Sequence, residues 1–456
     1  MTKTVFITCY HGFISRNIFN TDVLKILRKH QNITIVLFVP SHSRDFIQKH
    51  YGGENIIIEG VDFDKIVAAN KFWYRLSFLL ENSRYVKDQR KEHLWRNKTI
   101  PGYLNYWWLS SLSFVLSKLP LARSFYRFLD FRFSPQNAFD EYFEKYNPNL
   151  IFATDIFGET DALLIRQAKY RNIPVIGMVR SWDNTTTKGI LGIIPERIVV
   201  NSPVVKEELI KIHGCKPEII FIAGLPQFDT WLSGPTLSRQ EFFAKIVAEP
   251  QKRLILFAPA GNILSDTDWQ LCQILKEAMD NGSLPSNLQI LLRNHPQHPA
   301  DLLKFEKDRR FIIENPGSIS RPGDYKGANL SPQESEHLRN SVYYSEIIMY
   351  VATSLGLDAS IFNKPQILVS FDGFESKPYI KSVKRYNRED CLYNLISLGG
   401  TKVVQSGKEW VSAINDYLEN PLLDQVGRDE AVKQHLYKID GKAGERIANF
   451  ILDYLK

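Results

Sequence analysis

Short continuous apolar runs alternate with longer segments of helical spacing along the front half of this chain. Continuous apolar runs predict buried strands of a parallel sheet, and the segments between them place apolar residues at helical intervals. We predict strands at Val5–Cys9, Ile33–Val39, Ile56–Ile58, Leu150–Ala153, Val175–Val179, Arg197–Val200 and Ile219–Ile222, and helices at Val23–Lys29, Thr160–Tyr170 and Val204–His213.

The same alternation starts again after a break at Trp231–Gln240, which is rich in residues that end regular elements. Beyond it we predict strands at Arg253–Ala258, Leu288–Leu292, Phe311–Glu314, Ile347–Val351 and Gln366–Ser370, and helices at Trp269–Met279, Leu355–Phe362, Lys408–Leu418 and Ala443–Tyr454. Strands that alternate with helices predict a doubly wound sheet with helices on both faces. The fold class is therefore α/β, with two Rossmann-like halves facing each other across a cleft.

The segment Lys71–Phe133 interrupts this pattern and is rich in aromatic and basic residues, with few acidic ones. Basic side chains beside Trp and Tyr are typical of a helical insertion that lies on an anionic membrane surface. One alternative is an inserted helical subdomain whose aromatic residues pack inward. Another is a platform for single-stranded nucleic acid, which the pattern favours least, so we expect no nucleic acid partner.

Length and cysteine usage narrow the class of protein. With 456 residues the chain exceeds one α/β core, which supports two domains. The four cysteines form no C-x-x-C pair and stand beside no His at metal-ligand spacing, so we expect reduced thiols and no metal site. The first residues enter a short apolar strand at once, so we expect no signal peptide, and no apolar run reaches the roughly 18 residues of a membrane span. We expect a cytoplasmic protein that can lie peripherally at the inner face of the cytoplasmic membrane.

In the back half, candidate chemistry follows two predicted strands, at the edge of a parallel sheet where ligands bind. After one strand the chain reads ATSLGLDAS. Thr353 or Ser354 can cap the next helix, whose free amides favour a phosphate, and Asp358 lies one turn on, where it could accept ribose hydroxyls. The alternative is a plain helix cap with a surface aspartate.

A second back-half loop reads RNHPQHP directly after a buried strand. Arg293 offers a planar, permanently charged donor set that suits phosphate, and Pro296 holds His295 in an extended turn. A histidine alone is more often structural, but the pair of Arg and His after a strand favours a ligand site.

In the front half, the loop RSWDNTTTKG gathers charged and polar side chains after a buried strand. Burying them is costly unless they serve a ligand or a hydrogen-bond network. The alternative is a turn in which Asp183 and Asn184 act as Asx residues. The first loop, CYHGFISRN, holds His11, whose near-neutral pKa suits proton removal from a hydroxyl. Asp22 or Asp155 could do the same if burial raised its pKa.

Four segments together resemble the GT-B glycosyltransferases: RNHP at 293–296, TSLGLDASIFNKP at 353–365, SWDNTTTKG at 181–189 and DGKAGERIANFI at 440–451. More narrowly, the chain is similar to bacterial surface-polysaccharide transferases related to the CDP-glycerol glycerophosphotransferase and capsule Kdo transferase group. The resemblance implies an N-terminal acceptor domain at 1–235, a C-terminal nucleotide-donor domain at 245–425, and a last segment at 426–456 whose helix crosses back to the first domain.

The resemblance also implies an activity, the transfer of a sugar from a nucleotide-activated donor to a hydroxyl of a surface glycan or lipid-linked acceptor, without a cofactor or bound metal. Positive groups and helix amides would then stabilise the leaving group. His11 is the first candidate base, with Asp155 and Asp183 second. Donor contacts are expected at Arg293, His295, Thr353, Ser354, Lys188 and Asp358, the last standing where many members carry a longer Glu, and acceptor contacts at Asn17, Arg180, Trp182 and Asn184.

Three other activities remain open. A CDP-polyol phosphotransferase would attack phosphorus instead of the sugar carbon. A nucleotide-sugar epimerase of the same architecture would need no acceptor, and a non-catalytic subunit of a glycan assembly complex would show no nucleotide affinity.

Overall fold

The structure is a computed structural model, and it describes residues 2–10, 14–62, 71–134, 137–316, 318–319, 328–329 and 332–456. Contacts divide the chain into two compact units. Unit 1 comprises Met1–Asp229 and Asp440–Lys456, and unit 2 comprises Thr230–Ile439.

Unit 1 is built on a seven-stranded parallel sheet. Its strands are β1 Lys3–Thr8, β2 Ile33–Pro40, β3 Ile56–Val61, β4 Leu150–Ala153, β5 Val175–Met178, β6 Arg197–Val200 and β7 Ile220–Ile222. Their order is β3-β2-β1-β4-β5-β6-β7, so the chain changes direction across the sheet between β1 and β4. All seven strands were predicted, with small differences at their ends.

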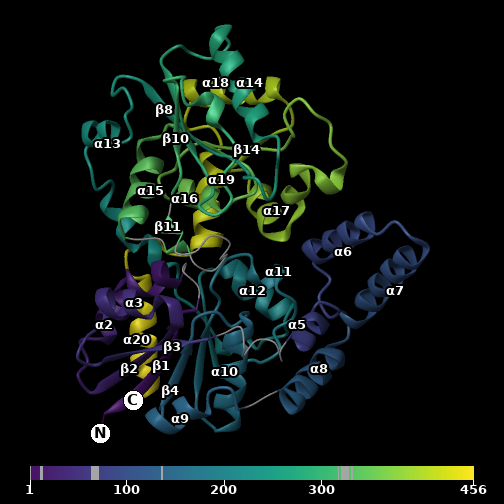
Figure 1. The fold of residues 1–456 in the computed structure, drawn as a ribbon, viewed down its shortest axis with the longest axis vertical. Coiled ribbons are helices and arrows are strands. Elements are labelled where there is room, and N and C mark those ends of the chain that lie inside the picture. The colour runs from purple at the N-terminus through teal and green to yellow at the C-terminus, as the bar shows by residue number, and fades with distance from the viewer. Residues whose placement is uncertain are drawn as a thin grey trace. The chain divides into compact units, whose positions relative to one another are not determined.

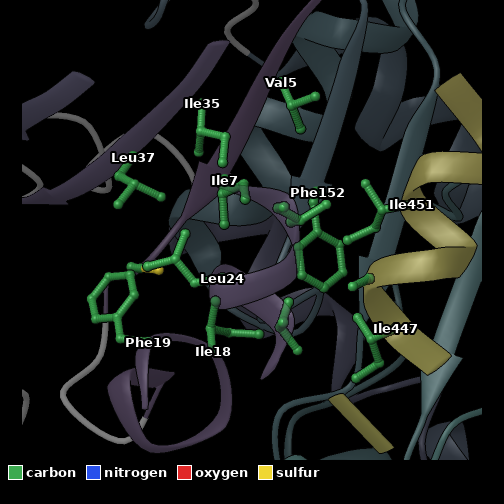
Figure 2. Packing of buried hydrophobic residues seen from close by; sticks show 14 of the residues in the cluster. Val5, Ile7, Ile18, Phe19, Leu24, Ile35, Leu37, Phe152, Ile447 and Ile451 are labelled. Atoms are coloured by element: carbon green, nitrogen blue, oxygen red, sulfur yellow. The ribbon is translucent and has the colours of Figure 1, made fainter. Parts of the chain in front are cut away.

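The helices of unit 1 cover this sheet and bury its apolar side chains. They are α2 Asp22–Leu27, α3 Arg44–Tyr51, α9 Asp140–Tyr146, α10 Glu159–Tyr170, α11 Asn184–Thr187, α12 Pro203–Lys211 and α20 Ala443–Leu455, with the π-helical turn η1 Ser15–Phe19. Figure 2 shows Ile447 and Ile451 of α20 beside Phe152 of β4, in the cluster that includes Ile7 of β1. The apolar face of α20 therefore ties the C-terminus into the core of unit 1.

Unit 2 is built on a six-stranded parallel sheet in the order β10-β9-β8-β13-β14-β15. The strands are β8 Arg253–Ala258, β9 Leu288–Arg293, β10 Phe311–Glu314, β13 Ile347–Tyr350, β14 Gln366–Val369 and β15 Lys402–Val404, and a separate antiparallel pair consists of β11 Ser318–Ile319 and β12 Ala328–Asn329. The helices are α13 Arg239–Lys245, α14 Asp268–Asp280, α15 Pro332–Tyr344, α16 Leu355–Ile361, α17 Asp390–Ser397, α18 Gly407–Glu419 and α19 Gln425–Ala431. Strand β15 was missed because it has three residues, of which only Val404 is buried.

Short helical turns join these elements. They are η2 Ser41–Ser43, η4 Pro217–Ile219, η5 Pro226–Ser233, η6 Leu303–Phe305, η7 Tyr379–Lys381, η8 Val383–Arg388 and the π-helical η9 Val432–Leu436.

Residues 426–439 belong to unit 2, although the expected last segment began at residue 426. Gly427 packs so closely on Gly400 that an added Cβ would lie 2.2 Å from the Gly400 nitrogen. The buried Arg428 donates to Asn363 Oδ1 at 2.7 Å. These contacts keep α19 and η9 with unit 2, and the part of the chain that returns to unit 1 starts at Asp440.

The segment 71–133 forms the helical insertion that its composition predicts. It consists of α5 Lys71–Ser77, α6 Arg84–Arg96, α7 Ile100–Leu116 and α8 Pro120–Phe133. Ser83 and Thr99 begin two of these helices by accepting hydrogen bonds from the amides of Val86 and Gly102. Helices α6 and α7 pack against each other (Figure 1). Among the described residues, no helix is long and apolar enough to span a membrane.

Candidate functional site

The carboxyl ends of β1 and β4 carry a buried polar cluster in unit 1. Thr8 ends β1, and its Oγ1 donates to Asp161 Oδ1 at 2.5 Å. Its Oγ1 also accepts from the Thr154 amide at 2.8 Å. The Asp155 amide donates to Asp161 Oδ1 at 3.3 Å. Since the chain reverses its course across the sheet between β1 and β4, this cluster occupies the position where such sheets bind ligands.

Asp155 lies at this edge together with two residues from the loops after β1 and β5. Arg180 Nε donates to Asp155 Oδ2 at 2.8 Å, and Asn17 Nδ2 reaches the Arg180 carbonyl at 3.5 Å. The remaining oxygens, Asp155 Oδ1 and Asn17 Oδ1, are buried and have no hydrogen-bond partner in the described part of the chain. Buried polar atoms are almost always hydrogen-bonded, so these two oxygens are available to accept from a ligand.

The two carboxyl groups of this cluster have different partners. Burial, together with the nearby negative charge of Asp155, raises the pKa of Asp161 to about 8 despite the lowering effect of the Thr8 hydrogen bond. At neutral pH Asp161 is therefore mostly a neutral acid. Asp155 forms an ion pair with Arg180, with 2.8 Å between Arg180 Nε and Asp155 Oδ2.

Sequence reasoning missed Asp161, because it falls inside a segment predicted simply as a helix. Its place in the first turn of α10, directly after the loop that follows β4, is the signal that could have singled it out. The raised pKa depends on burial and on the charge of Asp155, and a local pattern does not report how deeply a side chain is buried.

Two other front-half candidates, Asp183 and Asn184, bond within their own loop. The Asp183 carboxylate accepts from the hydroxyls of Ser181 and Thr187, and Asn184 Oδ1 accepts from the Ser181 amide at 3.1 Å. This is the turn network that the alternative interpretation describes. Trp182 is half-buried in the same loop.

Lys188 and His11 complete the list for this unit. Lys188 borders a small pocket of about 30 Å³ together with Tyr74, Tyr126 and Gly158. Gly158 is the N-cap residue of α10. It therefore belongs to unit 1, although it was grouped with the donor contacts. His11, the first candidate base, lies outside the described residues.

In unit 2, Arg293 ends β9 and is already engaged by carboxylates. Its Nη1 lies 3.1 Å from Glu314 Oε2, and its Nη2 lies 3.6 Å from Glu334 Oε2. Burial opposes ionisation of Glu314, but His337 and Arg293 together hold its pKa below the usual value. The guanidinium is thus held in place, and a phosphate that binds it must compete with the two glutamates.

His295 stands two residues beyond Arg293 in the same loop. Its Nδ1 accepts from the Gln297 amide at 3.2 Å, and its ring stacks on His298 with centroids 5.3 Å apart. Burial lowers the pKa of His295, and His298 lowers it further. A neutral imidazole can offer a hydrogen bond to a ligand, but it supplies no charge.

The loop after β13 leads into α16 and holds three candidates. Ser354 is exposed and takes the N-cap position, but its hydroxyl accepts no hydrogen bond from the first turn, so the expected side-chain cap is not formed. Thr353 is half-buried, and Asp358 is buried in the first turn of α16. The expectation of a surface aspartate, which was the alternative for Asp358, is therefore wrong.

A third loop at this edge follows β8 and was missed. Asp268, in the first turn of α14, accepts from the amides of Gly261 at 2.8 Å and Ala260 at 3.2 Å. Burial raises its pKa to about 6. Because β9, β8 and β13 are neighbours in the sheet, their three loops lie along one edge.

Within the described ranges, no group of three His, Cys, Asp or Glu residues is placed to hold a metal ion.

Comparison with solved structures identifies the architecture. The chain matches the UDP complex of S. aureus MnaA with a TM-score of 0.56 and 12% identity, covering 100% of this chain and 97% of that one. It matches the UDP-GlcNAc 2-epimerase of Neisseria meningitidis bound to UDP-GlcNAc with a TM-score of 0.54 and 11% identity, over 99% and 100% of the two chains. The chain has a GT-B fold.

A third structure with this fold is a single-residue variant of the wall teichoic acid polymerase TagF. Its TM-score is 0.50 at 11% identity, covering 100% of this chain and 89% of that one. No protein-family model and no curated protein matches the chain. The two-domain α/β fold with parallel sheets is therefore confirmed, and the narrower family suggested by the sequence stays a prediction.

Proposed function

We propose that the protein is a glycosyltransferase that moves a sugar from a nucleotide-activated donor to a hydroxyl of a surface glycan or lipid-linked acceptor. The observation that carries this proposal is the pair Asp155 and Asp161, in which burial raises the pKa of Asp161 while Asp155 pairs with Arg180 and keeps its Oδ1 without a partner among the described residues. A carboxyl group with a raised pKa beside a second carboxyl group is typical of acid-base sites.

Asp155 is the base in this proposal. Its Oδ1 accepts the proton of the acceptor hydroxyl, while Arg180 holds Oδ2 in place. The hydroxyl oxygen then bonds to the anomeric carbon of the donor sugar, and the bond from that carbon to the donor phosphate oxygen breaks. The electron pair of that bond leaves with the nucleotide, whose phosphates gain the negative charge.

The loops at the edge of β9, β8 and β13 provide the donor contacts. Arg293 supplies the positive charge, and Ser354 supplies a hydroxyl that the helix does not use. We expect these groups to stabilise the leaving phosphate without a bound metal. Two similarly folded proteins bind UDP and UDP-GlcNAc, which supports a nucleotide-sugar ligand.

A nucleotide-sugar 2-epimerase is the second candidate, because one of the similarly folded structures is the UDP-GlcNAc 2-epimerase of Neisseria meningitidis. An epimerase acts on one small soluble substrate, and the chain has a feature that such an enzyme does not need. This feature is the helical insertion α5 to α8, with its exposed aromatic residues.

One experiment separates the candidates. The purified chain is incubated with UDP-, GDP-, CMP- and dTDP-sugars and with CDP-glycerol, with and without a lipid-linked glycan acceptor. The masses of all products are then measured by mass spectrometry. We expect free nucleotide and a heavier acceptor only when both substrates are present. An epimerised sugar nucleotide formed without acceptor would show the epimerase, and CMP with an acceptor heavier by glycerol phosphate would show the phosphotransferase.

A further inference from the structure

Helix α7 turns its apolar face toward solvent. Trp107 and Trp108 are 65% and 66% exposed. Exposed apolar residues recur along the helix at helical spacing, at Ile100, Leu104, Trp107, Trp108, Phe114 and Val115. Its buried residue is polar: Ser113 donates to the Glu81 carbonyl at 3.0 Å and accepts from Arg90 at 2.9 Å. This is the reverse of the arrangement in a helix that packs on a protein core in water.

Helix α8 also exposes apolar side chains. Its inner face packs Tyr126 against Leu80 and Ile190. Polar contacts anchor it to the body of unit 1, with Asp130 paired to the buried Arg166 at 2.6 Å and Arg123 Nη1 donating to the Ile212 carbonyl at 2.7 Å. Its outer face carries Leu121, Phe125 and Phe128, all exposed. The polar contacts fix the rotation of α8, so the outward position of these side chains is built into the fold.

The opposite side of α7 faces α6. It borders an open pocket of about 630 Å³ with Gly102, Asn105, Tyr106 and Leu109, and residues of α5 and α6 line the other sides. The exposed stripe is therefore separate from the face that packs within the insertion.

The insertion also carries the positive charge of the protein. Residues 71–133 contain twelve Lys and Arg and four Asp and Glu, and because the net charge of the chain is +7, the remaining residues together carry −1. Two of the four acids, Glu81 and Asp130, are buried, and the other two pair with Lys91 and Arg96. The charged groups that the insertion exposes are thus mostly cationic.

Basic residues stand beside aromatic rings at the ends of these helices. Lys118 Nζ lies 3.8 Å from the centre of the Phe114 ring, and Arg132 lies 5.6 Å from that of Phe133. Exposed Trp and Phe next to Lys and Arg suit the boundary between acyl chains and headgroups, where rings insert and cations meet lipid phosphates. A helix of 17 residues is about 25 Å long and can lie in that boundary.

We propose that the outer faces of α7 and α8, with Lys98, Lys118 and Arg132, form a docking surface for a membrane that contains anionic lipids (Figure 1). The apolar stripes supply the insertion and the cations supply the preference for negative headgroups. The proposal goes beyond the transferase activity and holds whichever sugar chemistry the two sheets support, because it rests on the insertion alone.

The test is flotation of the full-length chain with vesicles of phosphatidylcholine, with and without phosphatidylglycerol, and it needs no enzyme assay. We expect flotation with the anionic vesicles, weakened by high salt. Replacing Trp107 and Trp108 together by Ser should weaken binding roughly tenfold or more. The matched control replaces Tyr170 and Leu422, which are exposed elsewhere, by Ser and should bind as the unaltered chain does.

Charge is tested separately. Changing Lys98, Lys118 and Arg132 to Gln should weaken anionic vesicle binding by roughly fivefold for each charge removed. Changing Lys29, Lys245 and Lys402, which are exposed outside the insertion, to Gln alters the net charge equally and should have much less effect. The proposal is overturned by absence of flotation, by equal binding to neutral vesicles, or by a dimer in light scattering that the Trp107 and Trp108 changes dissociate and that does not float.

Discussion

The carboxyl edges of the two parallel sheets carry different charged groups. In unit 1, burial raises the pKa of Asp161, and Asp155 pairs with Arg180 while its Oδ1 has no partner among the described residues. In unit 2, the charged group is the cation Arg293, and two glutamates already hold it. One edge can therefore take up a proton, while the other can bind an anion only by exchanging one partner for another.

The difference shows how the same sheet topology supports two roles. Both edges lie where the chain changes direction, at β1 and β4 in unit 1 and at β8 and β13 in unit 2. The topology supplies the position of the loops, and the charges on the loops decide what they do there.

The largest expected effect comes from changing Asp155 to Asn. If Asp155 is the base, turnover should fall by roughly a hundredfold to ten-thousandfold, while the Kd of the donor nucleotide stays the same. Turnover is measured with saturating substrates, and donor affinity by calorimetry. Asp183→Asn is the matched control, because hydroxyls of Ser181 and Thr187 already engage that carboxylate. Normal turnover in Asp155→Asn would assign proton removal to another group.

A smaller effect is expected at the other edge. Arg293→Ala should raise the Kd of the donor by roughly ten- to a hundredfold, because a hydrogen bond to a charged group is lost. Glu334→Gln should lower that Kd, since a half-exposed carboxylate no longer competes for the guanidinium. Calorimetric titration with the nucleotide measures both. An unchanged Kd in both variants would make Arg293 a structural ion pair.

The smallest effect is on stability, and it concerns Asp161. Its pKa is about 8 in the folded chain and about 4 when unfolded, so between these values the folded state binds the extra proton. Stability from this group is complete below about pH 4 and is lost as pH rises toward 8, with a slope of at most about 1.4 kcal/mol per pH unit. In Asp161→Asn that slope should disappear, with turnover largely kept.

Denaturant unfolding of the two proteins at a series of pH values from 5 to 8 measures this slope. Parallel stability curves for the variant and the unaltered chain would mean that Asp161 is ionised in the folded state, and the asymmetry within the carboxyl pair would be lost.

Much of the fold follows from local pattern, and the site follows only in part. The buried strands of both sheets were predicted because continuous apolar runs such as that of β2 have no stable position except inside a covered parallel sheet. Asn17, Arg180 and Asp155 were chosen separately as loop residues after strands, and the structure brings them together. Asp183 and Asn184 were chosen by the same rule and proved to bond within their own turn.

The sequence by itself determined the succession of strands and helices, the division into two α/β halves and the basic, aromatic character of the insertion, because each depends on residues close together along the chain. The tertiary structure decided the protonation of Asp161, the engagement of Arg293 and the outward face of α7. Those properties depend on partners such as Thr8, which is 153 positions from Asp161. Burial and charge act through space, so only the folded chain settles which side chains they change.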